Sequence, residues 1–187
     1  MDDHVFISSY LDLYQKSLFQ TNVTSQLISF KKKLIEIKDS TNKIMFAGNG
    51  ASASISSHCA VDFTKQGGVR AINFNEAGLI TCFANDYGYE DWVARAIGFY
   101  GNEGDIVVLI SSSGKSPNVV SAAKFAKEKG YYVVTFTGFL PDNPLKSLGD
   151  LNFWVDSSAY NIIENTHQIW LLTVCDLLIG KAEYKVV

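Results

Sequence analysis

The hydrophobic pattern divides the chain into a helical N-terminal part and a longer part in which short apolar runs alternate with helical ones. In the first 38 residues, apolar side chains recur every three or four positions, and the polar stretch 21–25 interrupts them. This spacing predicts two amphipathic helices. No change in composition separates these helices from the rest of the chain, so we expect them to pack on the same core or on another subunit, and the chain 1–187 to form a single domain.

From residue 43 onward, five short runs rich in β-branched and aromatic residues predict buried strands. They are residues 43–48, 70–74, 105–111, 131–138 and 152–156. Helical patterns are expected near residues 51–66, 89–99, 116–129 and 160–179. Strands that alternate with helices indicate right-handed crossovers and a parallel sheet. The predicted fold class is α/β, a three-layer sandwich around a central parallel sheet of about five strands.

Two loops follow predicted strands directly and lead into predicted helices. Their sequences are GNGASAS, residues 48–54, and SSSGKSPN, residues 111–118. Ligands of open parallel sheets bind outside the carboxyl ends of the strands. We therefore expect a binding site between these two loops.

The second loop has the chemistry of a phosphate site. Gly114 lets backbone amides converge, and a helix that starts at Pro117 adds the positive end of its dipole. Four hydroxyl groups accompany them, from Ser111, Ser112, Ser113 and Ser116. The pattern favours a phosphate monoester as ligand. The alternative is that Ser116 only caps the helix while the other serines fill a turn.

The first loop is less specific. Gly48 and Gly50 permit a tight strand-to-helix turn, and Ser52 and Ser54 can cap the helix or bind a ligand. A plain turn would have the same residues. The chain has neither the G-x-G-x-x-G pattern of dinucleotide-binding proteins nor a Walker loop, so we predict no nucleotide cofactor.

Composition narrows the range of partners. The chain is 47% hydrophobic and 19% charged with a formal charge of -3, so no basic surface indicates nucleic acid or an anionic membrane. No run of about 18 apolar residues predicts a membrane span, and no secretory leader is recognisable. The three cysteines, Cys59, Cys82 and Cys175, are scattered and odd in number, which favours reduced, buried thiols and a cytoplasmic protein.

The helix after the first loop carries a candidate reactive pair. His58 and Asp62 are four residues apart and share one helical face, a spacing that suits a metal ion or paired acid and base groups. The alternative is a partly buried histidine beside an acid.

Together, GNGASASISSH, ANDYGYED and ISSSGKSPNVV resemble the sugar isomerase (SIS) domain, in particular its phosphoheptose isomerase branch. The resemblance covers nearly the whole chain. It implies a flavodoxin-like α/β sandwich that converts sedoheptulose 7-phosphate to a heptose 7-phosphate for bacterial surface polysaccharides. It also implies a homotetramer with active sites between subunits, in which the helices of residues 1–38 pack at the interface.

The resemblance also implies roles for single residues. The four serines of the second loop match the positions that hold the phosphate. Asn49, Gly50 and Ser52 match substrate contacts of the first loop, and Asp86 matches a residue that lines the sugar site.

The catalytic positions match less completely. His58 and Asp62 fall on the family's H-x-x-x-E, with Asp62 in place of the glutamate base. Glu164 falls on the glutamine of Q-E-x-H and His167 on its histidine, while Leu172 replaces a second histidine that serves as general acid and metal ligand. We predict Asp62 and Glu164 as the catalytic carboxylates, and expect His167 to be held by packing or hydrogen bonds.

Three interpretations of the function remain open on the sequence alone. The first is the isomerase, with His58, Asp62 and Glu164 as candidate ligands of a zinc ion. The second is a non-catalytic SIS protein that binds a sugar phosphate or a partner, which the leucine at position 172 favours. The third is isomerisation of a different sugar phosphate.

Overall fold

The computed structural model describes residues 2–184, whose centre is a five-stranded parallel sheet with the strand order β2-β1-β3-β4-β5. The strands are β1 (Ile44–Gly48), β2 (Ala71–Asn73), β3 (Ile106–Ser111), β4 (Tyr132–Thr137) and β5 (Leu151–Trp154). β1, β3 and most of β4 are buried on both faces, which explains why their sequences are continuously apolar. The order is that of flavodoxin-like folds, so the predicted fold class is confirmed.

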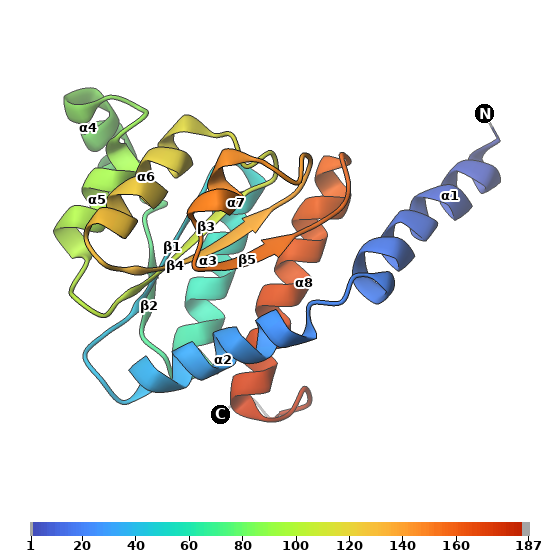
Figure 1. The fold of residues 1–187 in the computed structure, drawn as a ribbon, viewed down its shortest axis with the longest axis horizontal. Helices are drawn as coiled ribbons and strands as arrows, with labels where there is room; N and C mark the ends of the chain where they lie inside the picture. Colours follow the sequence, from blue (N-terminus) through green and yellow to red (C-terminus); the bar gives the residue numbers. More distant parts are fainter. Residues whose placement is uncertain (1, 185–187) are drawn as a thin grey trace.

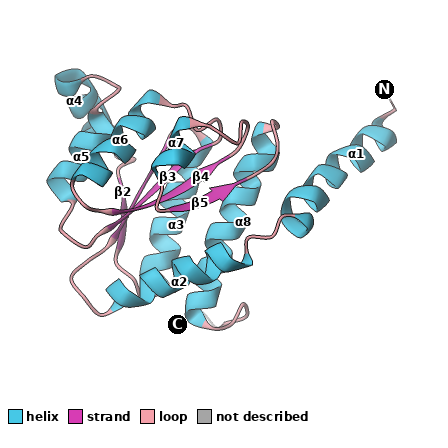
Figure 2. Cartoon of the chain, viewed as in Figure 1, coloured by secondary structure: helices cyan, strands magenta, loops and turns pink. Residues whose placement is uncertain are grey.

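Helices cover both faces of this sheet (Figures 1 and 2). They are α1 (Asp3–Gln15), a π-helical turn η1 (Lys16–Gln20), α2 (Thr24–Lys38), α3 (Ala51–Lys65), α4 (Ala77–Tyr87), α5 (Trp92–Tyr100), α6 (Pro117–Glu128), α7 (Pro144–Leu148) and α8 (Tyr160–Ile179). One core joins the sheet to α2, α3 and α8, and a second core joins its other face to α5, α6 and α7. The result is the expected three-layer sandwich.

The predicted elements lie within three residues of the observed ones, but two helices were not predicted. α4 has no buried residue, because its apolar side chains Leu79, Ile80 and Phe83 only border the second core. Its N-cap is Glu76, a residue type that seldom caps helices, whose carboxylate accepts from the Leu79 amide at 2.8 Å. Such a helix leaves a weak pattern. α7 is only five residues long.

The two N-terminal helices differ in their packing. α2 buries Phe30, Leu34 and Ile37 in the first core. α1 buries no residue and extends away from the rest of the chain (Figure 1). Its Phe6 side chain is 54% exposed, and Phe19 in η1 is 82% exposed. The chain's own core therefore explains the apolar face of α2 and leaves that of α1 uncovered.

The cysteines are free, and one of them corrects the prediction. Cys59 and Cys175 are buried, which is the main reason that the pKa of Cys59 is raised to about 12 and that of Cys175 to about 11. Cys82 is exposed, because it lies on α4, which has no buried residue. In the part of the chain that the structure describes, no helix is long and apolar enough to cross a membrane.

Candidate functional site

A cavity of about 250 Å³, here called the serine pocket, lies at the carboxyl ends of β1 and β3. It is lined by Asn49, Gly50, Ala51, Ser52, Ile110, Ser111, Ser112, Ser113, Ser116, Tyr160 and Glu164. The two loops meet because β1 and β3 are adjacent parallel strands, with Gly48 beside Ile110. Strand order reverses here, since β2 follows on one side and β4 on the other. All four loop serines, Asn49, Gly50, Ser52 and Glu164 thus lie where a single ligand can touch them.

The serine loop is held in a conformation that requires glycine at its centre. Gly114 has a φ of +64°, in the left-handed region, and a β-carbon there would collide with the side chain of Asn143. Asn143 is buried and caps α7 by accepting from the Lys146 amide at 3.0 Å. The loop is therefore pressed against α7 and has its shape before any ligand arrives.

The loop hydroxyls are only partly used within the protein. The hydroxyls of Ser111 and Ser116 share one hydrogen bond of 3.0 Å, and that of Ser113 accepts from the Lys115 amide at 3.2 Å. A hydroxyl group has one donor and two acceptor positions, so these groups can still bind the oxygens of a ligand.

Two helices begin at the serine pocket without a side-chain cap. The N-cap of α3 is Gly50 and that of α6 is Ser116, and neither makes a side-chain hydrogen bond to the first turn of its helix. Pro117 occupies the first position of α6. Uncapped amides and the positive ends of two helix dipoles favour an anion at this place.

Asn118 is a site residue that the sequence reasoning missed. Its side chain, 2% exposed, exchanges two hydrogen bonds of 2.9 Å with the amide of Asn49. The Tyr89 hydroxyl also donates to Asn49, at 3.4 Å. These bonds hold the Asn49 side chain at the pocket. The one indication of Asn118 in the sequence was a polar residue near the start of a predicted helix.

Glu164 brings a carboxylate into a pocket otherwise suited to an anion. It lies in the second turn of α8, and its Oε1 accepts from the Ser112 hydroxyl at 3.3 Å. Two unit negative charges about 4 Å apart repel by roughly 4 kcal/mol at an effective dielectric constant of 20. A Glu164 carboxylate that faces the pocket therefore weakens the binding of a phosphate dianion.

His58 and Asp62 lie outside the serine pocket, on the side of α3 that faces α8. Nε2 of His58 is 3.2 Å from Oδ2 of Asp62, and Nδ1 of His58 is 2.9 Å from Nε2 of Gln168. The His58 side chain is 46% exposed and that of Asp62 29%. We call these three residues the α3/α8 face. Gln168 was not predicted as a site residue.

The predicted pairing of Asp62 with Glu164 does not occur within one chain. Asp62 lies near Cys175 and Asp176, close enough for its charge to raise the pKa of both, after burial as the main cause. Glu164 instead lies in the serine pocket, where it bonds Ser112. The two carboxylates are therefore not in contact within residues 2–184 of one chain, and their catalytic pairing stays a prediction.

The residues present do not fit a metal ion either. No group of three or more His, Cys, Asp or Glu side chains that could hold a metal occurs within residues 2–184. Both ring nitrogens of His58 already have partners, and Leu172, which packs against the first core, offers no donor atom. The three predicted zinc ligands His58, Asp62 and Glu164 are not brought together.

His167 has the structural role that was expected. It is fully buried, its Nε2 bonds the carbonyl of Thr137 at 3.0 Å, and the edge of its ring meets Phe136. Burial lowers the pKa of His167 to about 4, although the bond to Thr137 opposes the shift. His167 thus ties α8 to the carboxyl end of β4.

Asp86 lies on α4 and does not line the serine pocket. Its carboxylate is exposed and accepts from the side chains of Asn85, at 2.9 Å, and Cys82, at 3.7 Å. No helix was predicted for this segment, whereas the last turn of α4 holds Asp86. The nearby residue that does reach the site is Tyr89.

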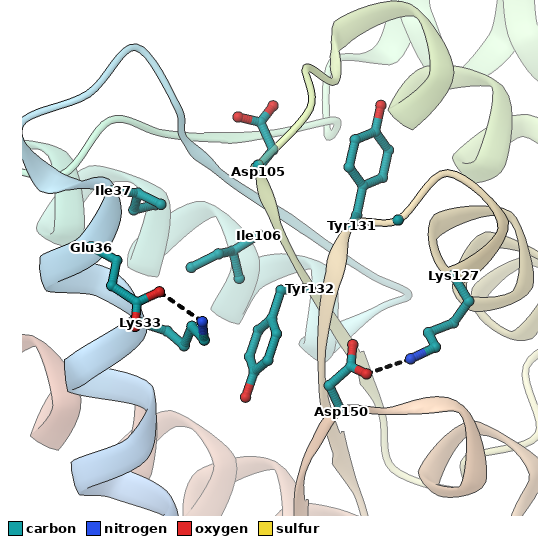
Figure 3. Close-up of a pocket in the computed structure, with 11 residues that line it drawn as sticks. Lys33, Glu36, Ile37, Asp105, Ile106, Lys127, Tyr131, Tyr132 and Asp150 are labelled. Atoms are coloured by element: carbon teal, nitrogen blue, oxygen red, sulfur yellow. Dashed lines mark hydrogen bonds and ion pairs between the residues drawn. The ribbon is translucent and has the colours of Figure 1, made fainter.

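A second cavity of about 430 Å³ lies at the opposite ends of the strands from the serine pocket, near the starts of β3 and β4 (Figure 3). Its charged groups all have partners: Lys33 pairs with Glu36 at 2.6 Å, Lys127 with Asp150, and Asp105 with the nearby Lys43 at 2.6 Å. It contains no predicted site residue. The serine pocket is therefore the better candidate for a ligand site.

Comparison with known proteins agrees with this geometry. The SIS domain family matches residues 16–138. A phosphoheptose isomerase of Helicobacter pylori (strain P12) is 34% identical over 151 residues, which cover 78% of this chain and 78% of the relative. One of Aneurinibacillus thermoaerophilus is 30% identical over 186 residues, which cover 95% and 93%. The structure of a phosphoheptose isomerase from Francisella tularensis superposes with a TM-score of 0.88 at 24% identity, over 97% of this chain and all of that one.

Proposed function

The chain belongs to the SIS domain family, and from this premise we propose that it isomerises a phosphorylated sugar, converting sedoheptulose 7-phosphate to a heptose 7-phosphate. The observation that carries the proposal is the serine pocket. It places four hydroxyl groups and two uncapped helix starts around a cavity of about 250 Å³. Relatives that are 30% or more identical over most of the chain are phosphoheptose isomerases.

In this proposal the serine loop binds the phosphate and the first loop binds sugar hydroxyls. Asn49, which Asn118 holds in place, and Ser52 have side chains that suit hydroxyl groups. Isomerisation then needs a base that takes a proton from the carbon beside the carbonyl and an acid that serves the oxygens. Asp62 is the proposed base, and Glu164, at the edge of the pocket, is the proposed second carboxylate.

The two carboxylates can act on one substrate if a second copy of the chain supplies one of them. Ala51 lies at the rim of the serine pocket, and Asp62 is about 16 Å further along α3. The half-exposed α3/α8 face and the uncovered apolar residues of α1 are surfaces that another subunit can cover. We therefore propose a homo-oligomer, a tetramer by resemblance, in which the α3/α8 face of one subunit meets the serine pocket of another.

A second candidate is a non-catalytic protein that binds a sugar phosphate and regulates a partner. Leu172 favours it, since a leucine cannot transfer a proton. Within residues 2–184 of one chain, no group of three or more His, Cys, Asp or Glu side chains could hold a zinc ion that would take over the role of the missing histidine. The isomerase remains the better proposal, because Asp62, His58 and Glu164 are all present, with Asp62 in contact with His58 and Glu164 hydrogen-bonded to Ser112.

The cellular setting follows from the reaction. A heptose 7-phosphate is a precursor of bacterial lipopolysaccharide or capsule, so we propose that the protein serves such a pathway and acts in the cytoplasm. Its surface gives no reason to expect nucleic acid or a membrane as partner, given a formal charge of -3.

The direct test is incubation of the protein with sedoheptulose 7-phosphate and with a panel of pentose and hexose phosphates. We expect the ketose to be consumed fastest with the seven-carbon substrate. Turnover of a different member of the panel would redirect the proposal to that sugar. Saturable binding without turnover across the whole panel would favour the regulatory candidate.

A further inference from the structure

The α3/α8 face contains a hydrogen bond between the two helices and, beside it, a close contact within α3. Gln168 Nε2 is 2.9 Å from His58 Nδ1, and His58 Nε2 is 3.2 Å from Asp62 Oδ2. Oδ1 of Asp62 has no part in these contacts. The proposed base therefore has one oxygen beside a fixed partner and the other available.

The chemistry of the two end groups selects one form of the histidine. A carboxylate only accepts hydrogen bonds, and an amide nitrogen only donates them. Gln168 therefore requires a bare Nδ1 on His58, which leaves the ring proton on Nε2, beside the Asp62 carboxylate. The hydrogen bond from Gln168 and the contact with Asp62 thus favour the same tautomer.

A pair such as His58 and Asp62 needs this support because it is half-exposed. Surface ion pairs four residues apart on a helix contribute only about 0.3–0.5 kcal/mol, too little to hold two side chains in one geometry. Gln168 belongs to a different helix, so its hydrogen bond restrains the imidazole from a second direction.

The neighbouring residues of α8 cannot replace Gln168. Glu164, Gln168 and Leu172 follow one another at four-residue intervals and so lie along one side of α8. Glu164 bonds Ser112 in the serine pocket, and Leu172 packs against the first core without a polar atom. Gln168 is the member of this row that contacts the reactive pair.

We propose that Gln168 is a positioning residue for the isomerisation, which fixes the tautomer and orientation of His58 and, through His58, the carboxylate of Asp62. This inference rests on the proposed function. Asp62 is one methylene shorter than the glutamate of the family pattern, and misplacement of a reacting group by about 1 Å can reduce a rate on the order of 100-fold. When Gln168 holds the His58 ring in place, the ring limits the positions of the Asp62 oxygens. This restriction compensates for the shorter side chain of Asp62.

The first test is the ¹⁵N NMR spectrum of His58 in the full-length protein, assigned by comparison with a His58→Gln variant. We expect a protonated Nε2 and an unprotonated Nδ1 in the wild type, and a mixture of tautomers in Gln168→Met, which keeps the side-chain volume but cannot donate. The opposite tautomer in the wild type, or no change in Gln168→Met, would overturn the proposal. This readout needs no turnover, so it stays decisive if the proposed reaction proves wrong.

The second test separates positioning from substrate binding in the kinetics. We expect kcat of Gln168→Met to fall about 10-fold or more while KM stays within about twofold, the usual size of effect for residues that orient a reactive group. Thr173→Val, five residues further along α8, is the control and should behave as the wild type. An unchanged kcat, or a rise in KM alone, would contradict a positioning role.

Discussion

The serine pocket and the α3/α8 face carry the two halves of the proposed chemistry, and they differ in how much of each a single chain completes. The pocket is enclosed by two loops, two helix starts and α8. The α3/α8 face is half-exposed, and its His58 is contacted by Gln168 and Asp62. In the proposed function, each chain thus has its own phosphate site, whereas the reaction needs a second chain.

This difference has a physical reason. A phosphate site uses backbone amides, helix dipoles and short hydroxyl side chains, all of which the edge of a parallel sheet supplies locally. Acid and base groups must instead both come within hydrogen-bond reach of the reacting atoms of one substrate. In this chain Glu164 lines the pocket and Asp62 does not.

The most informative variants change one carboxylate in each region. Asp62→Asn and Glu164→Gln should each reduce turnover by about 1,000-fold, because each removes an acid or base group. Calorimetric titration with inorganic phosphate should separate them. Asp62→Asn should bind phosphate as the wild type does, while Glu164→Gln should bind it about 10-fold more tightly, since a repelling charge is gone.

Asp39→Asn, an exposed carboxylate at the end of α2, is the matched control for these two variants and should change neither quantity. Full activity of either catalytic variant would refute its assigned role. Weaker phosphate binding by Glu164→Gln would show that the carboxylate does not face the bound anion.

Gly114→Ala tests whether the serine loop is rigid before the ligand binds. The substitution forces an alanine into the left-handed region and against Asn143, so the free energy of unfolding should fall by about 3 kcal/mol and phosphate binding should weaken. Gly130→Ala is the control. Gly130 also has a positive φ, of +75°, but open space around it, so only about 1–2 kcal/mol should be lost. Equal losses in urea unfolding would mean that the contact with Asn143 is unimportant.

His167 joins the two regions, because it ties α8 to the strand beside the serine loop. The pKa of His167 is lowered to about 4 in the folded protein, so folding favours its neutral form. The contribution of this group to the free energy of unfolding is fully present above the ordinary pKa of about 6.5 and is lost as the pH falls toward 4. Between pH 7 and pH 5 this group should reduce the free energy of unfolding by about 2 kcal/mol. In His167→Gln the decline, measured by urea unfolding, should be smaller by that amount. An unchanged decline would contradict the buried, neutral histidine.

A substitution in the exposed apolar surface of the N-terminal segment tests whether activity depends on a second chain. Phe19→Asp should shift the protein toward a smaller species in size-exclusion chromatography and lower turnover by about 10-fold, the equivalent of about 1.4 kcal/mol, with phosphate binding intact. Phe99→Asp changes a phenylalanine that is 67% exposed on α5 and should leave the size unchanged. A monomeric wild type with full activity would refute the shared site.

The sequence predicted most of the fold and the binding half of the site, for reasons visible in particular elements. β1 and β3 are buried on both faces, so their apolar runs were unambiguous, and the carboxyl ends of adjacent parallel strands had to bring Asn49 near the serine loop. α4 was missed because it buries no residue, and Asp86 lies on this helix, outside the serine pocket. Asn118 and Gln168 were missed because a polar residue on a helix reveals its partner only when the helices are packed.

The central claim is that the protein both binds a seven-carbon sugar phosphate in the serine pocket and isomerises it. The measurement that tests it most directly is ¹³C NMR of sedoheptulose 7-phosphate labelled at C2 and incubated with the wild-type protein. We expect the ketose signal to decline and an aldose C2 signal to grow in proportion, and Asp62→Asn to abolish both changes. A persistent ketose signal, in a sample whose phosphorus resonance reports saturable binding, would contradict the proposed isomerisation.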